Sequence, residues 1–442
     1  MVGSCQEITL MKINWFSPLP PARTDVADYT KHLLPALQKH AEIVLWTNQE
    51  KWDPELKQYA TVRHFESAEL PWLEFNQANL SIYNIANNPD FHYLIWEISR
   101  RSPGVVILHD FKLHNFFEVI YLKVKQSPSE YITQMAKYYG AEGRQNAEEF
   151  FWSGTLTTDH MVEHYPFTQL ALENAIGVIT HARGVFYDLR QEKQWPLIYT
   201  PLPYLANSKV INSSARKGKP YRIVVFGYFS TNRRLDVLLR ALASLTEKSH
   251  FQLDVYGQVS DVASIRKHIQ ELDLSRLVTL HGFVEDAKLD SALANAHLAI
   301  NLRYPTMGEA SGSQLRIWSH ALPSFVTQVG WYAELPENIV SFIRPEHEIE
   351  DIQRNLRNFL ENPSKFVEMG KNGKRFLEEK HTPEVCVQAI IDFANNLRSQ
   401  RRHYLAKKLL ERVGEQISIW NERTLIDSDI RKVAEAIDFI SS

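Results

Sequence analysis

The residues best suited to chemistry lie in the stretch RYPTMGEASGSQLR, residues 303–316. It follows an apolar, strand-like run, crowds small residues around Glu309, and then enters a helical pattern. Such a loop favours an anion, because the free N–H groups and the dipole of a helix start point at it. The Glu309 carboxylate can accept hydrogen bonds from sugar hydroxyls. The two features side by side suit a sugar linked to a phosphate, although turn chemistry and capping alone also use Gly and Ser.

Two adjacent arginines, Arg233 and Arg234, stand at the entry to another helical pattern, shortly after an apolar run and Gly227. Fork-shaped donors with a fixed positive charge at this position can face a diphosphate. The alternative is a pair of surface arginines.

In the first half of the chain, His109 ends an apolar run and is followed by Asp110. A strand-end histidine beside a carboxylate can donate to a sugar hydroxyl or a phosphate, and the alternative is a structural, partly buried histidine. An earlier loop is stiffened by prolines, and its Thr24 or Asp25 can cap the helix that follows.

The elements that must position these loops alternate along the chain as short apolar runs and longer amphipathic segments, which predicts parallel sheets with helices on both faces. Predicted strands are 13–16, 43–46, 80–85, 105–109, 176–180 and 197–199, then 222–226, 251–256, 277–281, 298–302, 324–327 and 339–342, with helices such as 26–37 and 93–100 between them. The fold class is therefore α/β. We expect two tandem doubly wound, Rossmann-like domains facing a cleft at the carboxyl ends of the strands.

The predicted boundaries follow changes in composition. Residues 1–10 are expected to be a disordered extension, 11–205 an N-terminal domain with a helical insertion near 126–173, 206–220 a linker, 221–382 a second domain, and 383–442 a helical tail whose first part packs back on the N-terminal domain. The tail carries a basic stretch, which is typical of a solvated helix face, with membrane-surface contact as the alternative.

Bulk properties exclude several classes. The 442 residues carry a formal net charge of −3, which gives no reason to expect nucleic acid as a partner. The two cysteines, Cys5 and Cys386, are far apart, so neither a disulfide framework nor a cysteine metal site is implied. With no signal-peptide pattern and no apolar run of spanning length, we expect a cytoplasmic protein, at most peripheral at the inner face of the membrane. The oligomeric state stays open.

Four stretches in order resemble glycosyltransferase family 4 on the GT-B fold, and the likeness extends over about residues 11–397. They are FSPLPPARTDVADYTKHLLPAL (16–37), NIANNPDFHYLIWEISRRSPGVVILHDFKLH (84–114), VVFGYFSTNRRLDVLLRAL (224–242), and NLRYPTMGEASGSQLR (301–316) with ALPSFVTQVGW (321–331).

This resemblance implies a retaining glycosyltransferase that moves a sugar from a nucleotide-diphosphate sugar to a glycan or lipid-linked acceptor in polysaccharide or glycoconjugate biosynthesis. It implies no metal and no cofactor beyond the donor substrate. Arg233 would contact the donor diphosphate, Glu309 the donor sugar, and His109 would lie near the transferred sugar. Implied donor-binding residues are Gly227, Arg234, Gly308, Ala310, Ser311, Gly312, Ser313 and Arg316, and implied acceptor-side residues are Thr24, Asp25 and Asp110.

The sequence departs from the family pattern in three places. Arg316 stands where the second glutamate of the family's Glu pair holds the ribose, and Arg cannot accept a hydrogen bond. Tyr228 or Phe229 replaces the first arginine of the donor-phosphate pair, and the glycine of the N-terminal loop is replaced around Thr24 and Asp25. A catalytically impaired scaffold or partner subunit is therefore an alternative, and an epimerase on a similar fold is another. Nicotinamide-dependent chemistry fits poorly, because no GxGxxG follows the first strand of either half.

Overall fold

The structure is a computed structural model that describes residues 10–205, 218–397, 410 and 413–414. Within these residues the chain divides into two compact units. The first unit comprises 10–180, 188–199 and 387 onward, and the second comprises 181–187 and 200–386. The predictions for residues 1–9, for most of the linker and for most of the tail after 397 fall outside the described residues.

The first unit is built on a seven-stranded sheet in the order β3-β2-β1-β4-β5-β6-β7, with all neighbours parallel. Its strands are β1 (Met11–Phe16), β2 (Ala41–Thr47), β3 (Thr61–His64), β4 (Leu80–Ile85), β5 (Gly104–Leu108), β6 (Ala175–Thr180) and β7 (Leu197–Tyr199). Every residue of β4, β5 and β6 is buried, which is typical of parallel strands that are covered on both faces of the sheet. The sequence did not predict β3, because this edge strand is largely exposed and has one apolar residue among four.

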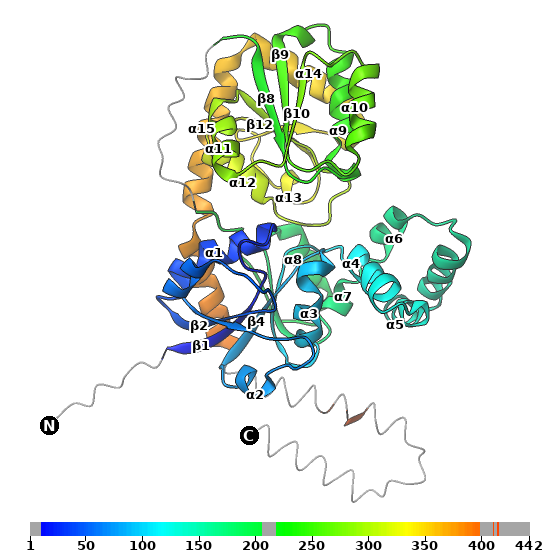
Figure 1. The fold of residues 1–442 in the computed structure, drawn as a ribbon, viewed down its shortest axis with the longest axis vertical. Coiled ribbons are helices and arrows are strands. Elements are labelled where there is room, and N and C mark those ends of the chain that lie inside the picture. The colour runs from blue at the N-terminus through cyan, green and yellow to red at the C-terminus, as the bar shows by residue number, and fades with distance from the viewer. Residues whose placement is uncertain (1–9, 206–217, 398–409, 411–412, 415–442) are drawn as a thin grey trace, which may run out of the picture. The chain divides into compact units, whose positions relative to one another are not determined.

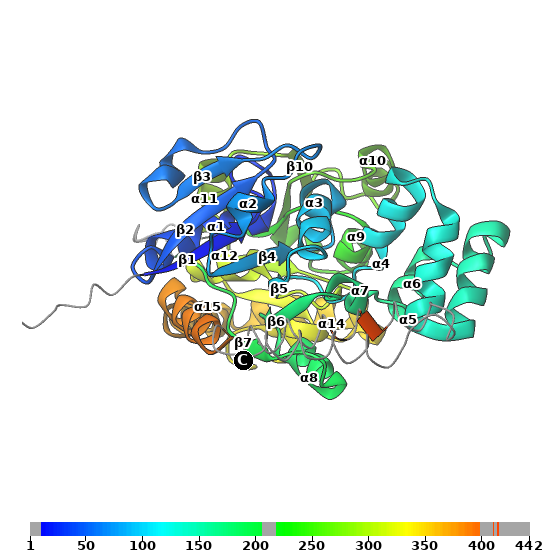
Figure 2. The same cartoon turned by 90° about the horizontal axis from the view of Figure 1, so that it is seen from below.

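Helices cover this sheet and extend beyond it. They are α1 (Asp25–Leu37), η1 (Pro54–Gln58), α2 (Trp72–Phe75), α3 (Pro89–Ser99), α4 (His114–Glu118), η2 (Val119–Val124), α5 (Pro128–Glu148), η3 (Glu149–Ser153), α6 (Thr158–His164), α7 (Thr168–Ala171) and α8 (Arg183–Glu192), the last crossing between the units. The segment predicted as a helical insertion contains α5 to α7, of which α5 and α6 project to one side of the sheet (Figures 1 and 2). A helix over residues 383–397 also packs on the sheet, because a Cβ added at Gly177 would lie 2.7 Å from Leu397 and 2.8 Å from Phe393.

The second unit has a six-stranded parallel sheet in the order β10-β9-β8-β11-β12-β13. The strands are β8 (Tyr221–Phe226), β9 (Phe251–Tyr256), β10 (Val278–Gly282), β11 (Leu298–Asn301), β12 (Ser324–Thr327) and β13 (Ser341–Ile343). The connecting helices are η5 (Thr231–Arg233), α9 (Leu235–Ala243), η6 (Lys248–His250), α10 (Val262–Glu271), α11 (Asp286–Asn295), α12 (Gly312–Ser319), α13 (Gly330–Ala333), η7 (Pro345–His347), α14 (Glu348–Glu361) and α15 (Pro363–Lys380).

Alternate residues of β8 face two different cores in this unit. Ile223 and Val225 pack in a cluster with α9, α10 and α14, whereas Val224 packs in a second cluster with α11 and α12. These helices lie on opposite sides of the sheet in Figure 1. Both sheets are thus covered on two faces, which confirms the predicted pair of doubly wound α/β domains.

Strand order reverses once in each sheet, and a crevice outside the strand carboxyl ends is expected there. In the second unit the chain runs from β8 outward to β9 and β10, then returns to β11 on the other side of β8. In the first unit the reversal lies between β1 and β4. The loops after β8 and β11 in the second unit, and those after β1 and β4 in the first unit, therefore form the two regions in which to look for a site. In the part of the chain that the structure describes, no helix is long and apolar enough to cross a membrane.

Candidate active site

The loop after β8 is held against the neighbouring loop by direct backbone contact. Gly227 and Gly257 both have positive φ angles, 124° and 120°. A Cβ at Gly257 would lie 1.9 Å from the carbonyl oxygen of Gly227, so only glycine fits there. Farther along, the Phe229 N–H donates to the Gln258 carbonyl at 2.8 Å. The loop therefore leaves β8 along a fixed path.

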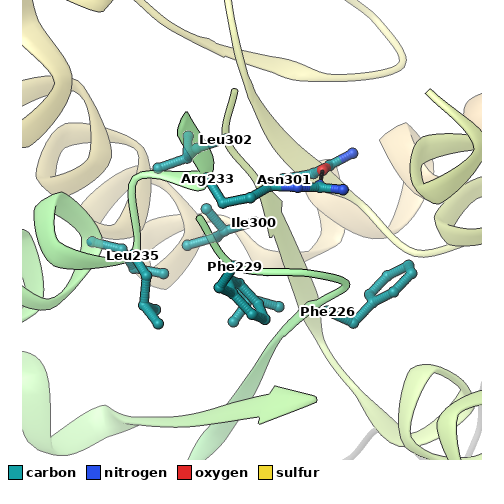
Figure 3. Close-up of a pocket in the computed structure, with 9 residues that line it drawn as sticks. Phe226, Phe229, Arg233, Leu235, Ile300, Asn301 and Leu302 are labelled. Atoms are coloured by element: carbon teal, nitrogen blue, oxygen red, sulfur yellow. Dashed lines mark hydrogen bonds between the residues drawn. The ribbon is translucent and has the colours of Figure 1, made fainter. Parts of the chain in front are cut away.

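That path places Arg233 beside the end of β11. Its Nη1 donates to Oδ1 of the buried Asn301 at 3.0 Å. Asn301 Nδ2 in turn donates to Gln314 Oε1 at 3.2 Å, and Gln314 Nε2 donates to the Ser324 hydroxyl at 2.7 Å. Asn301 and Arg233 lie side by side in Figure 3. A chain of buried amides thus fixes the guanidinium at the point where strand order reverses.

The space beneath Arg233 is too small for a substrate. Apolar side chains line it, with Phe229, Leu235 and Ile300 among them (Figure 3). Its cavity volume of about 10 Å³ is room for one water molecule at most. Any ligand of Arg233 must therefore approach from the side of the loops, and the apolar residues support the arginine from below.

Helix α12 begins next to this arginine with a hydroxyl cap. The hydroxyl of Ser311, which directly follows Ala310, accepts the Gln314 N–H at 3.1 Å. In an α-helix the first N–H groups have no partner within the helix, so Gly312 and Ser313 present theirs at its start. Because Gln314 also bonds Asn301, the start of the helix and Arg233 belong to one hydrogen-bonded assembly. The predicted anion cradle and the predicted arginine are brought together.

Glu309 is engaged by its own loop. Its carboxylate lies 3.0 Å from Arg303 Nε, and it accepts the Thr306 hydroxyl at 3.1 Å and the Met307 N–H at 2.8 Å. Gly308, with φ 83°, donates its N–H to Thr306 Oγ1 at 3.1 Å. The side chains of Arg303 and Glu309 are 16% and 13% exposed. Glu309 therefore orders the loop through its own carboxylate.

Arg234 turns away from Arg233 and toward α14. Its guanidinium contacts both carboxylate oxygens of Glu348, whose side chain is only 5% exposed, at distances of 2.5 to 3.1 Å. This hydrogen bond with Glu348 raises the pKa of Arg234 above its usual value. In this structure Arg234 thus ties the loop to the domain, whereas the sequence predicted a donor contact.

Arg316 is bound by two aspartates of α11. Its Nη1 donates to Asp286 Oδ1 at 2.8 Å, and its Nε and Nη2 donate to Asp290 Oδ1 at 3.0 and 2.8 Å. His320 Nε2 lies 3.2 Å from the same Asp290 oxygen. The arginine that replaces the expected acidic residue is therefore joined to two carboxylates.

In the first unit, His109 lies directly after β5 and its Nε2 is 2.9 Å from Asn84 Oδ1. Asn84 Nδ2 donates to the carbonyl of Phe16, at the end of β1, at 3.1 Å. The Tyr29 ring of α1 meets the imidazole edge-on, with centroids 4.8 Å apart. His109 is therefore fixed by contacts from both sides of the reversal between β1 and β4.

The other predicted acceptor-side residues serve the local backbone. The Thr24 hydroxyl accepts the Val26 N–H at 3.4 Å and caps α1, which begins at Asp25. The Asp110 carboxylate accepts the Asn87 N–H at 2.7 Å. These contacts hold the loops after β1 and β4 in shape.

Two polar residues beside these loops, one in each unit, were not predicted. Asn301 ends the otherwise apolar strand β11, and Asn84 lies within the fully buried strand β4. An asparagine inside an apolar run was the available signal, since a buried amide requires hydrogen-bond partners.

The chain is similar to known proteins in part of its sequence and in its fold. Residues 207–376 match the family model described as glycosyl transferases group 1. A search of curated proteins found no match.

Among solved structures, sucrose-phosphate synthase from Thermosynechococcus elongatus is similar with a TM-score of 0.61 at 15% identity, over 88% of this chain and 99% of that one. HepE from Anabaena in complex with UDP and glucose has a TM-score of 0.60 at 14% identity, over 86% and 98%. WaaG, a glycosyltransferase involved in lipopolysaccharide biosynthesis, has a TM-score of 0.56 at 14% identity, over 87% and 99%. At these identities the likeness establishes the fold, which is GT-B.

Proposed function

We propose that this chain is a glycosyltransferase that moves a sugar from a nucleotide-diphosphate sugar to a glycan or lipid-linked acceptor. The observation that carries the proposal is Arg233, held by Asn301 beside the start of α12. A fixed guanidinium and a helix start both favour a diphosphate. The group 1 match over residues 207–376 supports the reading, as does the similar fold of HepE, whose structure holds UDP and glucose.

The chemistry follows from where charge develops. As the bond between the sugar C1 and the diphosphate oxygen breaks, its electron pair remains on the departing phosphate. Arg233 and the N–H groups of Gly312 and Ser313 are already in place to stabilise that charge, which lowers the barrier more than groups that must reorganise. We assign no cofactor and no metal to the transfer, because these groups supply positive charge themselves.

Retention of the anomeric configuration belongs to the same proposal. The acceptor hydroxyl would attack C1 on the face from which the diphosphate leaves. A bond forms between C1 and the acceptor oxygen while the hydroxyl proton passes to a phosphate oxygen of the leaving group. Glu309 would accept hydrogen bonds from the donor sugar, and His109, with Thr24, Asp25 and Asp110 of the same unit, would serve the acceptor side. An acceptor in cell-surface polysaccharide or glycoconjugate synthesis would suit a protein peripheral to the inner membrane face.

Calorimetric titration with nucleoside diphosphates and their sugars tests the donor site. We expect at least one to bind, and Arg233→Ala to weaken it tenfold or more. Arg240→Ala is a matched control, because Arg240 is an exposed arginine of α9 paired with Asp236. If no nucleoside diphosphate binds the native chain, the proposal is wrong. Transfer should persist in EDTA, and NMR of the product should show the donor's anomeric configuration.

A second candidate is a donor-binding subunit that does not turn over. It is favoured by the engagement of the Glu309 carboxylate by Arg303 and of the Arg316 guanidinium by Asp286 and Asp290. Such a protein would bind the diphosphate and show neither transfer to an acceptor nor hydrolysis of the donor. The titration and a donor-consumption assay together separate the two candidates.

A further inference from the structure

Helix α6, in the segment that projects to one side of the first sheet (Figure 1), carries two histidines one turn apart. His160 and His164 are four residues apart, so they lie on the same face of the helix. Their rings are stacked, with centroids 4.2 Å apart and planes inclined by 27°. Neither residue is buried. Two imidazoles are therefore side by side and accessible to solvent.

A different face of α6 holds the helix in place. Met161 and Val162 are buried, and so is Tyr165, which follows the last helical residue. The hydroxyl of Thr157 accepts the His160 N–H at 3.2 Å and caps the start of the helix. Because the backbone is fixed at its start and along its buried face, the two imidazoles are presented from a rigid support.

One hydrogen bond determines which ring nitrogen of His164 is available. Its Nδ1 lies 3.0 Å from the carbonyl oxygen of His160. A carbonyl oxygen can only accept, so in the neutral ring Nδ1 carries the proton and Nε2 carries the lone pair. A hydrogen bond from one ring nitrogen to a backbone carbonyl is the usual partner of a metal bond at the other nitrogen. Within the described residues, the ring of His160 makes no hydrogen bond.

The charges around the pair favour a cation. Asp159 precedes His160 and is exposed, and α6 ends at His164, where the helix dipole is negative. Glu163 precedes His164, but its carboxylate is bound by Lys112. Asp159 and the helix end therefore supply negative charge, while Glu163 is already neutralised.

The ligand atoms indicate the class of ion. Neutral imidazole suits zinc, copper and nickel, whereas magnesium and calcium take oxygen ligands. Metalloproteases use two histidines at this spacing on one helix as zinc ligands. A bond from zinc to an imidazole nitrogen is about 2.0–2.1 Å long, so two nitrogens on one ion are at most about 4 Å apart. Rings whose centroids lie 4.2 Å apart reach that geometry by a small rotation of their exposed side chains.

We propose that His160 and His164 together bind one divalent transition-metal ion through their Nε2 atoms. Among the described residues, no group of three or more His, Cys, Asp or Glu side chains could hold a metal ion, so water would complete the coordination. The proposal is independent of the donor site, because it concerns a helix of the first unit and the sugar transfer is expected to persist in EDTA. The ion would bridge two turns of α6 and stabilise the folded helix.

Calorimetric titration of the full chain with nickel chloride, and separately with zinc chloride, tests the site. His160→Gln and His164→Gln should each weaken binding by at least about tenfold, because one imidazole remains where two shared the ion. His40→Gln is the matched control, since His40 is exposed and has no other histidine within four residues on either side. It should bind both ions as the native chain does. Magnesium chloride should not compete.

Two further measurements separate a shared ion from binding at single histidines. With one equivalent of Cu²⁺, electron paramagnetic resonance should show two nitrogen ligands in the native chain and one in His164→Gln. Nickel should raise the unfolding temperature of the native chain more than that of His164→Gln, whereas without metal the two should unfold alike, because His164 is exposed. Native nickel affinity in both single variants overturns the proposal, as does an equal loss in His40→Gln. A native chain that binds neither ion more tightly than the variant lacking both histidines overturns it as well.

Discussion

Arg234 joins the loop after β8 to the first residue of α14 by clasping both carboxylate oxygens of Glu348. It does so from a backbone in the left-handed region, at φ 54°, where a side chain costs energy that glycine avoids. The nearly buried Glu348 has its charge balanced in return. The pair therefore stabilises a strained turn directly beside Arg233.

We predict that Arg234→Ala destabilises the protein by about 3 kcal/mol, because it leaves a buried carboxylate without its partner. Arg234→Gly loses the same ion pair but relieves the strain at positive φ, so it should be about 1 kcal/mol less harmful. Thermal unfolding of both variants gives the comparison. Equal stability of the two would show that the left-handed turn carries no strain.

Arg233→Ala should lower turnover a hundredfold or more, because it removes a preorganised charge from the leaving diphosphate. Arg233→Lys should recover part of the rate, since it keeps the charge but loses the fork that bonds Asn301. Donor-consumption kinetics measure both, with Arg240→Ala as the control. Native turnover in a folded Arg233→Ala protein would remove Arg233 from the mechanism.

Glu309→Gln separates a sugar contact from loop ordering. If Glu309 also contacts the donor sugar, the variant should bind the nucleotide sugar several-fold more weakly and bind the sugar-free diphosphate as before. If Glu309 only orders the loop through Arg303, Thr306 and Met307, both ligands should weaken together. Titrations with the two ligands decide. Unchanged binding of both would contradict either role.

Stability should fall with acid between the two pKa values of a buried histidine. Burial lowers the pKa of His92 to about 4, although its hydrogen bond to the Asn84 carbonyl opposes this shift. Among the described residues, Nε2 of His92 has no hydrogen-bond partner, so a second proton there would be unsatisfied. A histidine in the unfolded chain titrates near pH 6.5. Below that pH the unfolded chain therefore binds more protons than the folded chain, and the free energy of unfolding falls.

His92→Asn tests this, because its amide can donate to the Asn84 carbonyl without titrating. The loss of unfolding temperature between about pH 6.5 and pH 4 should be smaller in the variant. It should not vanish, because burial also lowers the pKa of His114 to about 4. A pH profile parallel to that of the native protein would show that His92 does not contribute.

The fold was predictable from the sequence because strands covered on both faces of a sheet appear as short apolar runs. The residues of β4 are all buried and were predicted with their observed bounds, whereas the exposed edge strand β3 lacks an apolar pattern and was missed. The observed ends of several strands differ from the predicted ends by one or two residues. His109, for example, was predicted to end its strand and lies just beyond β5.

The site was recoverable only in part, because side-chain partners come from distant segments. Arg233 and the start of α12 were predicted from local pattern. Their link through Asn301 joins residues 68 positions apart, and the Arg234 contact with Glu348 joins residues 114 positions apart. No local pattern distinguishes a solvated arginine from one bound to a carboxylate in a different helix. The loops were therefore predictable from the sequence. It was not predictable that Arg233 bonds Asn301 whereas Arg234 bonds Glu348.

The contact between Gly257 and Gly227 restricts how this protein can diverge. A methyl group at Gly257 would overlap the Gly227 carbonyl, and the resulting displacement would pass along the loop to Arg233. Arg233 Nη2 would itself lie 3.2 Å from a Cβ at Gly227. Natural variants and engineered libraries can therefore exchange exposed loop residues such as Tyr228, which is 57% exposed, while these two positions stay invariant. New ligand preferences are accessible by altering what surrounds the arginine, and not by moving the arginine itself.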